Sequence, residues 1–180
     1  DMVILVHGHP SEDRLLMTVQ RRLKEELDKL QVQMNLEKTR VVDLKRGGWF
    51  SFLGFDIRLN RNREGKTYVS KTPRMKKRKE LGIKVRAVLR SNRDRPLKEV
   101  IQAVNAVIRG WVNYFRIGNS NRTFDKVRCF IEKKVRRFVA KRKGLKGFGW
   151  KRWSREEIYG KWGLYQDYRI CYLYPKATSS

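Results

Sequence analysis

The positive charge of this 180-residue chain is concentrated in its last two thirds. The first 60 residues hold 10 Lys and Arg against 9 Asp and Glu, whereas the remaining 120 residues hold 34 against 9. Solubility alone requires a net charge of only about 2 to 8 in a small domain. The abrupt change near residues 60–63 therefore predicts two modules with different tasks.

The composition restricts what the basic module can be. Apolar residues make up 40% of the chain, which is enough for a core and excludes a disordered basic tail. The formal net charge of +26 requires a polyanion to relieve its self-repulsion, and nucleic acid is the default partner. No apolar run reaches the roughly 18 residues of a membrane span, so no contact with a membrane is expected.

Residues 1–72 are predicted to form an α+β piece with the order βαβββ. The apolar run 2–6 indicates a buried strand, and apolar residues at helical spacing indicate a helix over about 11–31. Residues 40–44 and 49–58 are predicted as strands joined by a hairpin turn at 45–48, because glycines there supply positive φ angles. A turn at 60–66 and a strand at 67–70 complete this part.

Residues 73–143 are predicted to form a bundle of three amphipathic helices. The apolar stripes indicate helices over 74–89, 96–115 and 123–138. Pro96 suits a helix start, where its missing N–H costs nothing, and Thr123 is expected to cap the third helix. The remaining residues, 144–180, are a basic tail rich in Gly, Trp and Tyr, with a short helix expected near 155–159.

The end of the second bundle helix is predicted to have two roles. Trp111 and Phe115 lie on the apolar stripe and are expected in the core. Gly110 costs about 1 kcal/mol relative to alanine inside a helix, which indicates the close approach of another backbone, from protein or RNA. Three polar residues project from other positions around the helix and can reach solvent or RNA: Arg109, Asn113 and Arg116.

Basic residues with interleaved aromatic rings are the strongest functional signal. Phosphates attract Lys and Arg, whereas unstacked bases stack on flat rings and guanidinium groups. A solvated helix face is the ordinary explanation for a charge run, but these runs are nearly free of acids, which favours nucleic-acid contact. Trp150 and Trp153 are evenly balanced between packing and stacking. Besides the three polar residues above, the candidate RNA-binding residues are Lys71, Arg74, Lys76, Lys77, Arg78, Lys133, Lys134, Arg136, Arg137, Lys141, Arg142, Trp150, Lys151, Arg152 and Trp153.

The sequence offers no complete catalytic or metal site. His7 and His9 alternate in a Gly/Pro loop without a third ligand, which favours a solvent-facing pair over a metal site. Cys129 and Cys171 lie far apart and fit neither a zinc site nor a disulfide framework. We therefore expect no metal and no cofactor in this chain.

Four segments together carry a family resemblance. They are the start of the chain, Asp1-Met-Val-Ile-Leu-Val6, and the blocks Asn35-Leu-Glu-Lys-Thr39, Phe52-Leu-Gly-Phe55 and Arg109-Gly-Trp-Val-Asn-Tyr-Phe115. Each block is weak alone. In this order and at this spacing they resemble the group II intron reverse transcriptase/maturase family.

The resemblance implies a fold and roles for these blocks. Residues 1–72 correspond to the C-terminal part of a polymerase palm, with Asp1 matching the second Asp of the family's Asp-Asp motif. Residues 73–143 correspond to the helical maturase-specific domain, also called domain X or thumb, and 144–180 resemble the start of a DNA-binding region. The palm motif supplies Asn35, Glu37, Lys38 and Thr39. The primer-grip-like residues are Phe52, Leu53, Gly54 and Phe55.

The chain departs from the family in its polymerase site. Two-metal phosphoryl transfer needs at least two carboxylates to hold both ions. The family's upstream Asp, the first Asp of the pair and the fingers lie outside these residues, so Asp1 alone cannot assemble the site. Mg²⁺ is expected for the full-length polymerase, and the missing N-terminal fingers and palm portion is an expected partner of this chain.

The resemblance implies that the chain binds group II intron RNA, and the primer–template duplex, to support splicing and reverse transcription by a full-length parent. Other expected partners are an RNA–DNA duplex or target DNA, within an intron ribonucleoprotein in a bacterial cytoplasm or an organelle. Two alternatives stay open. One is half of an RNA-directed DNA polymerase that is active only with its upstream half, and the other is a general basic RNA chaperone without intron preference.

The missing carboxylates predict that the isolated chain does not synthesise DNA. The measurement is primer extension on a primed RNA template with Mg²⁺. Extension by the pure protein above a control without protein would contradict this prediction.

Overall fold

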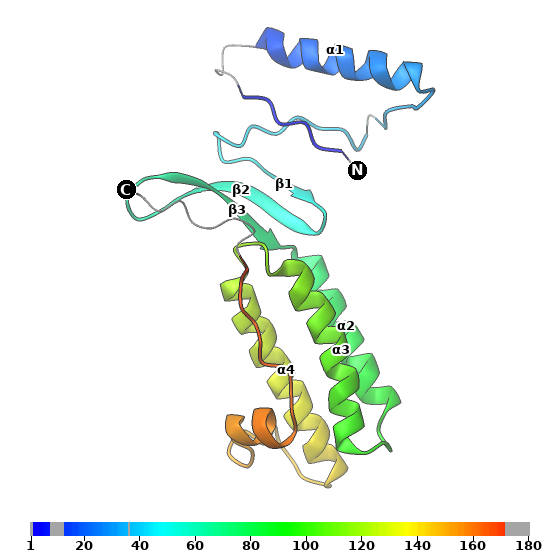
Figure 1. The fold of residues 1–180 in the computed structure, drawn as a ribbon, viewed down its shortest axis with the longest axis vertical. Helices are drawn as coiled ribbons and strands as arrows, with labels where there is room; N and C mark the ends of the chain where they lie inside the picture. Colours follow the sequence, from blue (N-terminus) through cyan, green and yellow to red (C-terminus); the bar gives the residue numbers. More distant parts are fainter. Residues whose placement is uncertain (1, 8–12, 36, 172–180) are drawn as a thin grey trace.

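The computed structural model describes residues 2–7, 13–35 and 37–171. The described chain is elongated, with an N-terminal helix at one end, a small sheet in the middle and a helical bundle at the other end (Figure 1). The fold is α+β, as the sequence predicts. The palm and thumb assignments of its parts stay predictions.

The sheet is an antiparallel meander of three strands. Its strands are β1 (Trp49–Phe52), β2 (Phe55–Arg61) and β3 (Thr67–Pro73), in the order β1-β2-β3. Phe52 pairs with Phe55, so only Leu53 and Gly54 form the turn of the first hairpin. Their φ angles of +46° and +79° are both positive, as a two-residue type I′ turn requires.

The predicted strands 2–6 and 40–44 are wrong. The described residues of both segments are irregular, because neither segment has a neighbouring strand with which to pair its backbone groups. The turn at 45–48 exists but joins no hairpin, and the predicted strand 49–58 is divided in two by the turn at Leu53. Strand 67–70 is confirmed and extends to Pro73.

The three predicted bundle helices are confirmed as α2 (Met75–Ser91), α3 (Leu97–Phe115) and α4 (Asn121–Arg142). Pro96 stands at the N-cap of α3, as expected. The N-cap of α4 is Ser120 rather than Thr123, and the Ser120 hydroxyl donates to the carbonyl of Phe115 at 2.7 Å. The buried core follows the apolar stripes through Leu81, Val85, Leu89, Val100, Ile101, Val104, Ile108, Val112, Phe115, Phe124, Val127, Ile131, Val135 and Val139.

The sheet joins the bundle at the end of α3. Phe55 is buried and its ring lies 5.0 Å from that of Phe115. The loop after α3 clasps β3, because the backbone N–H of Asn119 donates to the carbonyl of Lys71 at 2.7 Å. A Cβ added at Gly118 would lie 2.6 Å from the same carbonyl, so only glycine allows this approach.

The residues after α4 fold back onto the bundle (Figure 1). They contain the short π-helix η1 (Glu157–Lys161), near the predicted helix 155–159. Trp153, Ile158 and Leu164 are buried with the bundle core. Asn105 of α3 donates to the carbonyl of Gly163 and accepts from the N–H of Tyr165, at 2.7 and 2.8 Å. Residues 144–171 are therefore a layer of the bundle and not a free basic tail.

The part before the sheet has no core of its own. α1 (Asp13–Lys29) confirms the predicted helix, but its apolar side chains Leu16, Val19, Leu23 and Leu27 are only half-buried. Among the described residues, none before Phe55 is buried. No helix in the described ranges is both long and apolar enough to cross a membrane.

Leu53 is a site of backbone strain that a substitution should relieve. A non-glycine residue in the left-handed region costs roughly 1 kcal/mol, and asparagine tolerates it best. The Leu53 side chain is 59% exposed, so little packing is lost. Leu53→Asn should therefore raise the free energy of unfolding by about 0.5 to 1 kcal/mol, measured by urea titration.

The matched control is Val69→Asn in β3, at an equally exposed apolar residue without a positive φ angle. This variant should gain no stability, because asparagine is unfavourable in strands. A loss of stability in Leu53→Asn would show that the leucine side chain matters more than its backbone strain.

Candidate nucleic-acid interface

A basic surface lies along α2 and α4, and we call it the basic face. The four residues from α4 recur at intervals that place them on one side of the helix, where they meet two residues of α2. None of the six forms an ion pair within the described ranges of the chain. The basic face consists of Lys79, Arg86, Lys126, Lys133, Lys134 and Arg137.

Two aromatic rings lie among these cations. The Arg86 guanidinium and the Lys134 ammonium lie 5.9 and 5.4 Å from the centre of the Phe130 ring. Lys133 and Arg137 lie 4.3 and 5.4 Å from the centre of the Phe148 ring. Each ring therefore holds two cations in place through its electron-rich surface.

A groove of about 390 Å³ runs between α2 and α4 within the basic face. Its apolar lining includes Ile83, Val127 and Phe130, and its walls carry basic side chains. Gly82 brings the helices together here, because a Cβ added to it would lie only 3.3 Å from the Phe130 ring. Arg78 also lines the groove, and its buried Nε has no hydrogen-bond partner. The groove thus offers an apolar floor between unpaired positive groups.

The pKa of Lys134 reflects the positive charges that surround it. Partial burial and the nearby charges of Arg86, Arg137 and Lys133 lower the pKa of its ammonium. A bound anion such as a phosphate would oppose this effect by favouring the charged form. The basic face is therefore arranged to gain from binding a polyanion.

Glu132 fastens the C-terminal layer to α4 from inside the bundle. Its side chain is fully buried and forms ion pairs with Arg136 at 3.0 Å and with Arg155 at 3.2 Å. The Tyr159 hydroxyl donates to the same carboxylate at 2.7 Å. Burial favours the neutral acid, but the hydrogen bonds from Tyr159 and Arg136 and the charges of Arg155 and Arg136 outweigh it. The pKa of the Glu132 carboxyl is therefore lowered.

Two candidate RNA-binding residues belong to this internal network instead. Arg136 is only 2% exposed, and its Nε donates to the carbonyl of Trp153 at 3.2 Å. Trp153 is itself buried, which assigns it to packing. Trp150 is exposed, and one surface of its ring lies 4.1 Å from the Arg136 guanidinium. Arg136 and Trp153 are therefore held within the protein and are left out of the interface.

The three polar residues at the end of α3 differ in their exposure and in their contacts. Arg109 and Asn113 are exposed, and Arg109 lies 6.0 Å from the centre of the Tyr165 ring. Arg116 is tied to the C-terminal layer, because it forms an ion pair with Asp167 at 3.3 Å and donates to the Tyr165 hydroxyl. Arg116 is thus held by contacts within the protein, although its side chain is still 21% exposed, and its binding to RNA stays a prediction.

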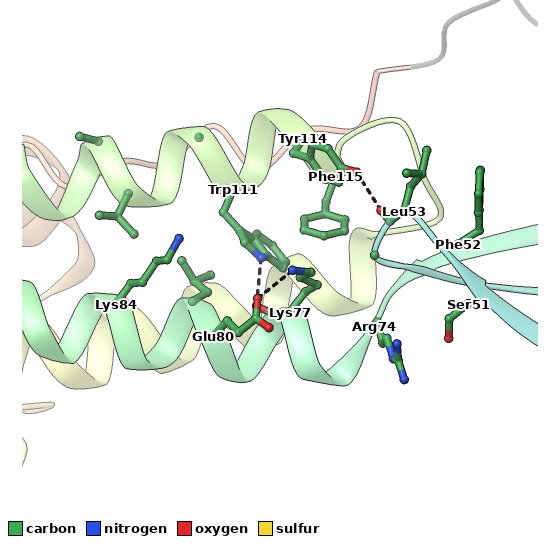
Figure 2. A pocket seen from close by; sticks show the side chains of 15 residues that line it. Ser51, Phe52, Leu53, Arg74, Lys77, Glu80, Lys84, Trp111, Tyr114 and Phe115 are labelled. Carbon is green, nitrogen blue, oxygen red and sulfur yellow. Dashed lines mark hydrogen bonds and ion pairs between the residues drawn. The ribbon is translucent and has the colours of Figure 1, made fainter. Parts of the chain in front are cut away.

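The candidates at the start of α2 lie on two different surfaces. Arg78 lines the α2–α4 groove, whereas Arg74 and Lys77 line a second pocket, between α2 and α3 (Figure 2). Lys76 and Lys71 are exposed, and the backbone N–H of Lys71 donates to Asn119.

The hairpin residues Phe52, Leu53 and Gly54 lie at one end of the α2–α3 pocket (Figure 2). Phe55 instead belongs to the core. The Tyr114 hydroxyl fixes the turn by donating to the carbonyl of Leu53 at 2.8 Å. This hairpin therefore forms part of the wall of a pocket.

The remaining basic candidates are exposed, and two of them donate hydrogen bonds to backbone carbonyls in loops. Arg142 donates to the carbonyl of Arg95 at 2.8 Å, and Arg152 donates to that of Lys146 at 3.0 Å. Lys141 and Lys151 are exposed near the end of α4 and in the layer after it.

The palm-motif residues lie apart from the bundle, in the N-terminal part of the molecule (Figure 1). Asn35 closes a turn by accepting from the backbone N–H of Lys38, and the Thr39 hydroxyl donates to the carbonyl of Asn35. Glu37 lies within this turn, and Asp1 and His9 fall outside the described residues. Within those residues, no group of three His, Cys, Asp or Glu side chains could hold a metal ion.

The RNA-binding candidates chosen from the sequence do not include five residues of this interface, which are Lys79, Arg86, Lys126, Phe130 and Phe148. The spacing of Lys126, Phe130 and Lys134 along one side of α4 is a signal that could have indicated the first ring. Arg86 and Phe148 come from other segments, so no local pattern connects them with α4.

Glu132 should dominate the stability of this part of the molecule. Glu132→Gln removes the charge that compensates buried Arg136, which should cost about 3 to 5 kcal/mol in urea titrations at pH 7. Because the folded pKa of Glu132 is lowered from 4.5, its contribution is complete above that pH and is lost as the pH falls through the folded pKa. The difference between the two proteins should therefore shrink below about pH 4.5.

The control is Asp125→Asn, which breaks an exposed ion pair with Arg128 and lies about two turns before Glu132 in α4. This variant should lose less than about 1 kcal/mol. Equal losses in the two variants would contradict the structural role of Glu132.

Comparison with known proteins bears on the bundle and the layer that follows it. Residues 78–162 match the family model described as group II intron, maturase-specific domain. The match covers α3 and α4, most of α2 and the C-terminal layer as far as Trp162. No curated protein matches the chain. The match confirms the family resemblance seen in the sequence, because residues 78–162 of this protein are similar to the group II intron maturase-specific domain.

Proposed function

We propose that this protein binds group II intron RNA through its basic face and thereby supports intron splicing. The observation that carries the proposal is a set of six cations on α2 and α4 that form no ion pair within the described ranges. They belong to a segment that matches the maturase-specific domain. Involvement in group II intron splicing follows from that match, and the RNA-binding surface is our assignment.

Electrostatic repulsion among the cations of the basic face favours the binding of RNA phosphates. Partial burial, together with the neighbouring charges of the basic face, lowers the pKa of Lys134. RNA phosphates laid along α2 and α4 would replace this repulsion with attraction and release condensed counterions. Phe148, beside Lys133 and Arg137, is 39% exposed, and Trp150, beside Arg136, is 48% exposed, which suits stacking with unpaired bases.

Other exposed candidates extend the proposed surface. Lys141 lies in the last turn of α4, and Lys151 and Arg152 lie in the C-terminal layer that follows it. Binding of a primer–template duplex or target DNA, the Mg²⁺ of a full-length polymerase and a location in an intron ribonucleoprotein stay proposals that rest on the family resemblance.

The proposal predicts that neutralising the basic face weakens RNA binding much more than an equal loss of charge elsewhere. A variant with Arg86, Lys126, Lys133 and Arg137 changed to Gln should bind a group II intron transcript about 100-fold more weakly at moderate salt. The slope of log K against log[salt] should become shallower by roughly 3, because each phosphate contact contributes about 0.7 to 0.9. Filter binding at several salt concentrations measures both quantities.

The matched control changes Arg14, Arg21, Arg22 and Lys24 of α1 to Gln, which removes the same charge from the N-terminal part. It should lose less than about threefold in affinity, because net charge alone acts only at long range. Equal losses in both variants would contradict the basic face as the interface.

Competition with bulk tRNA separates this proposal from a general RNA chaperone. An excess of tRNA should displace the intron transcript poorly from the wild-type protein if the intron is the specific partner. Equal competition by tRNA and by unlabelled intron would favour the chaperone.

A further inference from the structure

A second pocket lies between α2 and α3, outside the basic face. Its volume is about 750 Å³, within the usual range for binding sites of small organic groups. Two helices and the β1–β2 hairpin enclose it, and the hairpin closes one end (Figure 2). No part of the proposed basic face lines it, so it requires its own explanation.

The charges that line the pocket favour an anion. Arg74, Lys77 and Lys84 come from the start of α2 and from its next turns. The one acidic residue in the lining, Glu80, forms an ion pair with Lys77 at 2.9 Å. Arg74 and Lys84 therefore remain as positive groups at separate places along the pocket (Figure 2).

The aromatic side chains in the lining are held with their polar atoms already bonded to protein. The Trp111 indole donates from Nε1 to the carbonyl of Lys77 at 3.3 Å. Its ring is braced 4.6 Å from that of Phe115 in the core, and the side chain is only half-buried. Tyr114 likewise donates its hydroxyl to Leu53. The pocket therefore presents fixed rings, as a stacking site for a base requires.

Gly110 shows how closely a ligand could approach the helix. It lies within α3, where glycine is unfavourable, and a Cβ added there would meet no atom within 4 Å. No neighbouring protein segment therefore explains this glycine, in contrast to Gly82 beneath Phe130. Ala106, one turn earlier, is the next small residue in the lining. Together they leave the surface of α3 bare toward the pocket.

We propose that this pocket takes one unstacked nucleotide of a bound RNA, with its base beside Trp111 and its sugar–phosphate backbone close to α3 at Gly110. The inference rests on the proposed RNA binding and adds a site separate from the basic face. A polypeptide occupant is less favoured, because the acidic residue in the lining, Glu80, is already paired with Lys77 and the remaining positive groups suit phosphate.

The test fills the pocket without changing its charge. Gly110→Ala and Ala106→Leu add side-chain volume toward the pocket, whereas Ala87→Leu adds it at an exposed position of α2 that lines neither pocket. The probes are a single-stranded oligouridylate of about 10 nucleotides and a blunt RNA duplex of equal length. Binding is measured by fluorescence anisotropy, and stability by thermal melting.

We expect opposite effects on stability and on binding. Gly110→Ala should melt about 2 to 4 °C higher than the wild type, because alanine favours the helix and meets no clash. Ala106→Leu should weaken binding of the single strand about 10-fold, the loss of one stacked base, and Gly110→Ala should weaken it a few-fold. Binding of the duplex by both variants, and of both probes by Ala87→Leu, should stay within about twofold of the wild type.

The outcomes separate this inference from the proposed function. Normal binding of both probes by both pocket variants would overturn the nucleotide site alone, and a polypeptide occupant would give that result. Equal weakening for single strand and duplex would also overturn it, because the pocket would then act on phosphates without an unstacked base. Failure of the wild-type protein to bind any RNA, including the intron transcript, would overturn the proposed function and this inference together.

Discussion

The shape of the bundle surface depends on the contacts that the buried carboxylate of Glu132 makes. It holds Arg136 on its own helix and reaches Arg155 and Tyr159 in the C-terminal layer. A buried charge is costly unless its partners compensate it, so these groups must come together as a set. Their assembly brings Trp153 and Ile158 into the core and places Phe148 beside the cations of α4. The layer after α4 thus decides which side of that helix is left for a partner.

This arrangement explains why the strongest charge runs in the sequence do not all become surface. The run at the end of α4 contains Arg136, which faces inward, between Lys134 and Arg137, which face outward. One helical turn therefore serves both the internal ion pair and the external basic face. The start of α2 is divided in a similar way, because Arg78 faces the groove with α4 while Lys77 faces the pocket with α3. The molecule thus presents positive charge on two sides of a single helix.

The bundle could be predicted from the sequence because its apolar residues recur with the period of a helix and bury themselves locally. The strands were harder to predict, because the sequence pattern does not show whether residues 2–6 have a neighbouring strand with which to pair. The hairpin turn was misplaced because Leu53 has a positive φ angle, which leucine rarely adopts, whereas the glycines at 47–48 looked better suited. The roles of Arg116 and Arg136 were hidden for another reason. Arg116 pairs with Asp167 of the C-terminal layer, whereas Arg136 pairs with Glu132 on its own helix and also donates to the carbonyl of Trp153 in that layer.

Within the part of the chain that the structure describes, no side chain before Phe55 is buried, and this has a consequence for how the protein unfolds. Stability in a protein is local, and segments with few buried contacts open with less free energy than the core. The amide hydrogens of α1 should therefore exchange with solvent well before those of α3, which contributes six buried apolar side chains to the core. Opening of α1 leaves the maturase-specific domain intact, since none of that domain's core residues lies in α1. The free energy of local opening should therefore decrease along the molecule, from the Glu132 network in the bundle to α1 at the opposite end.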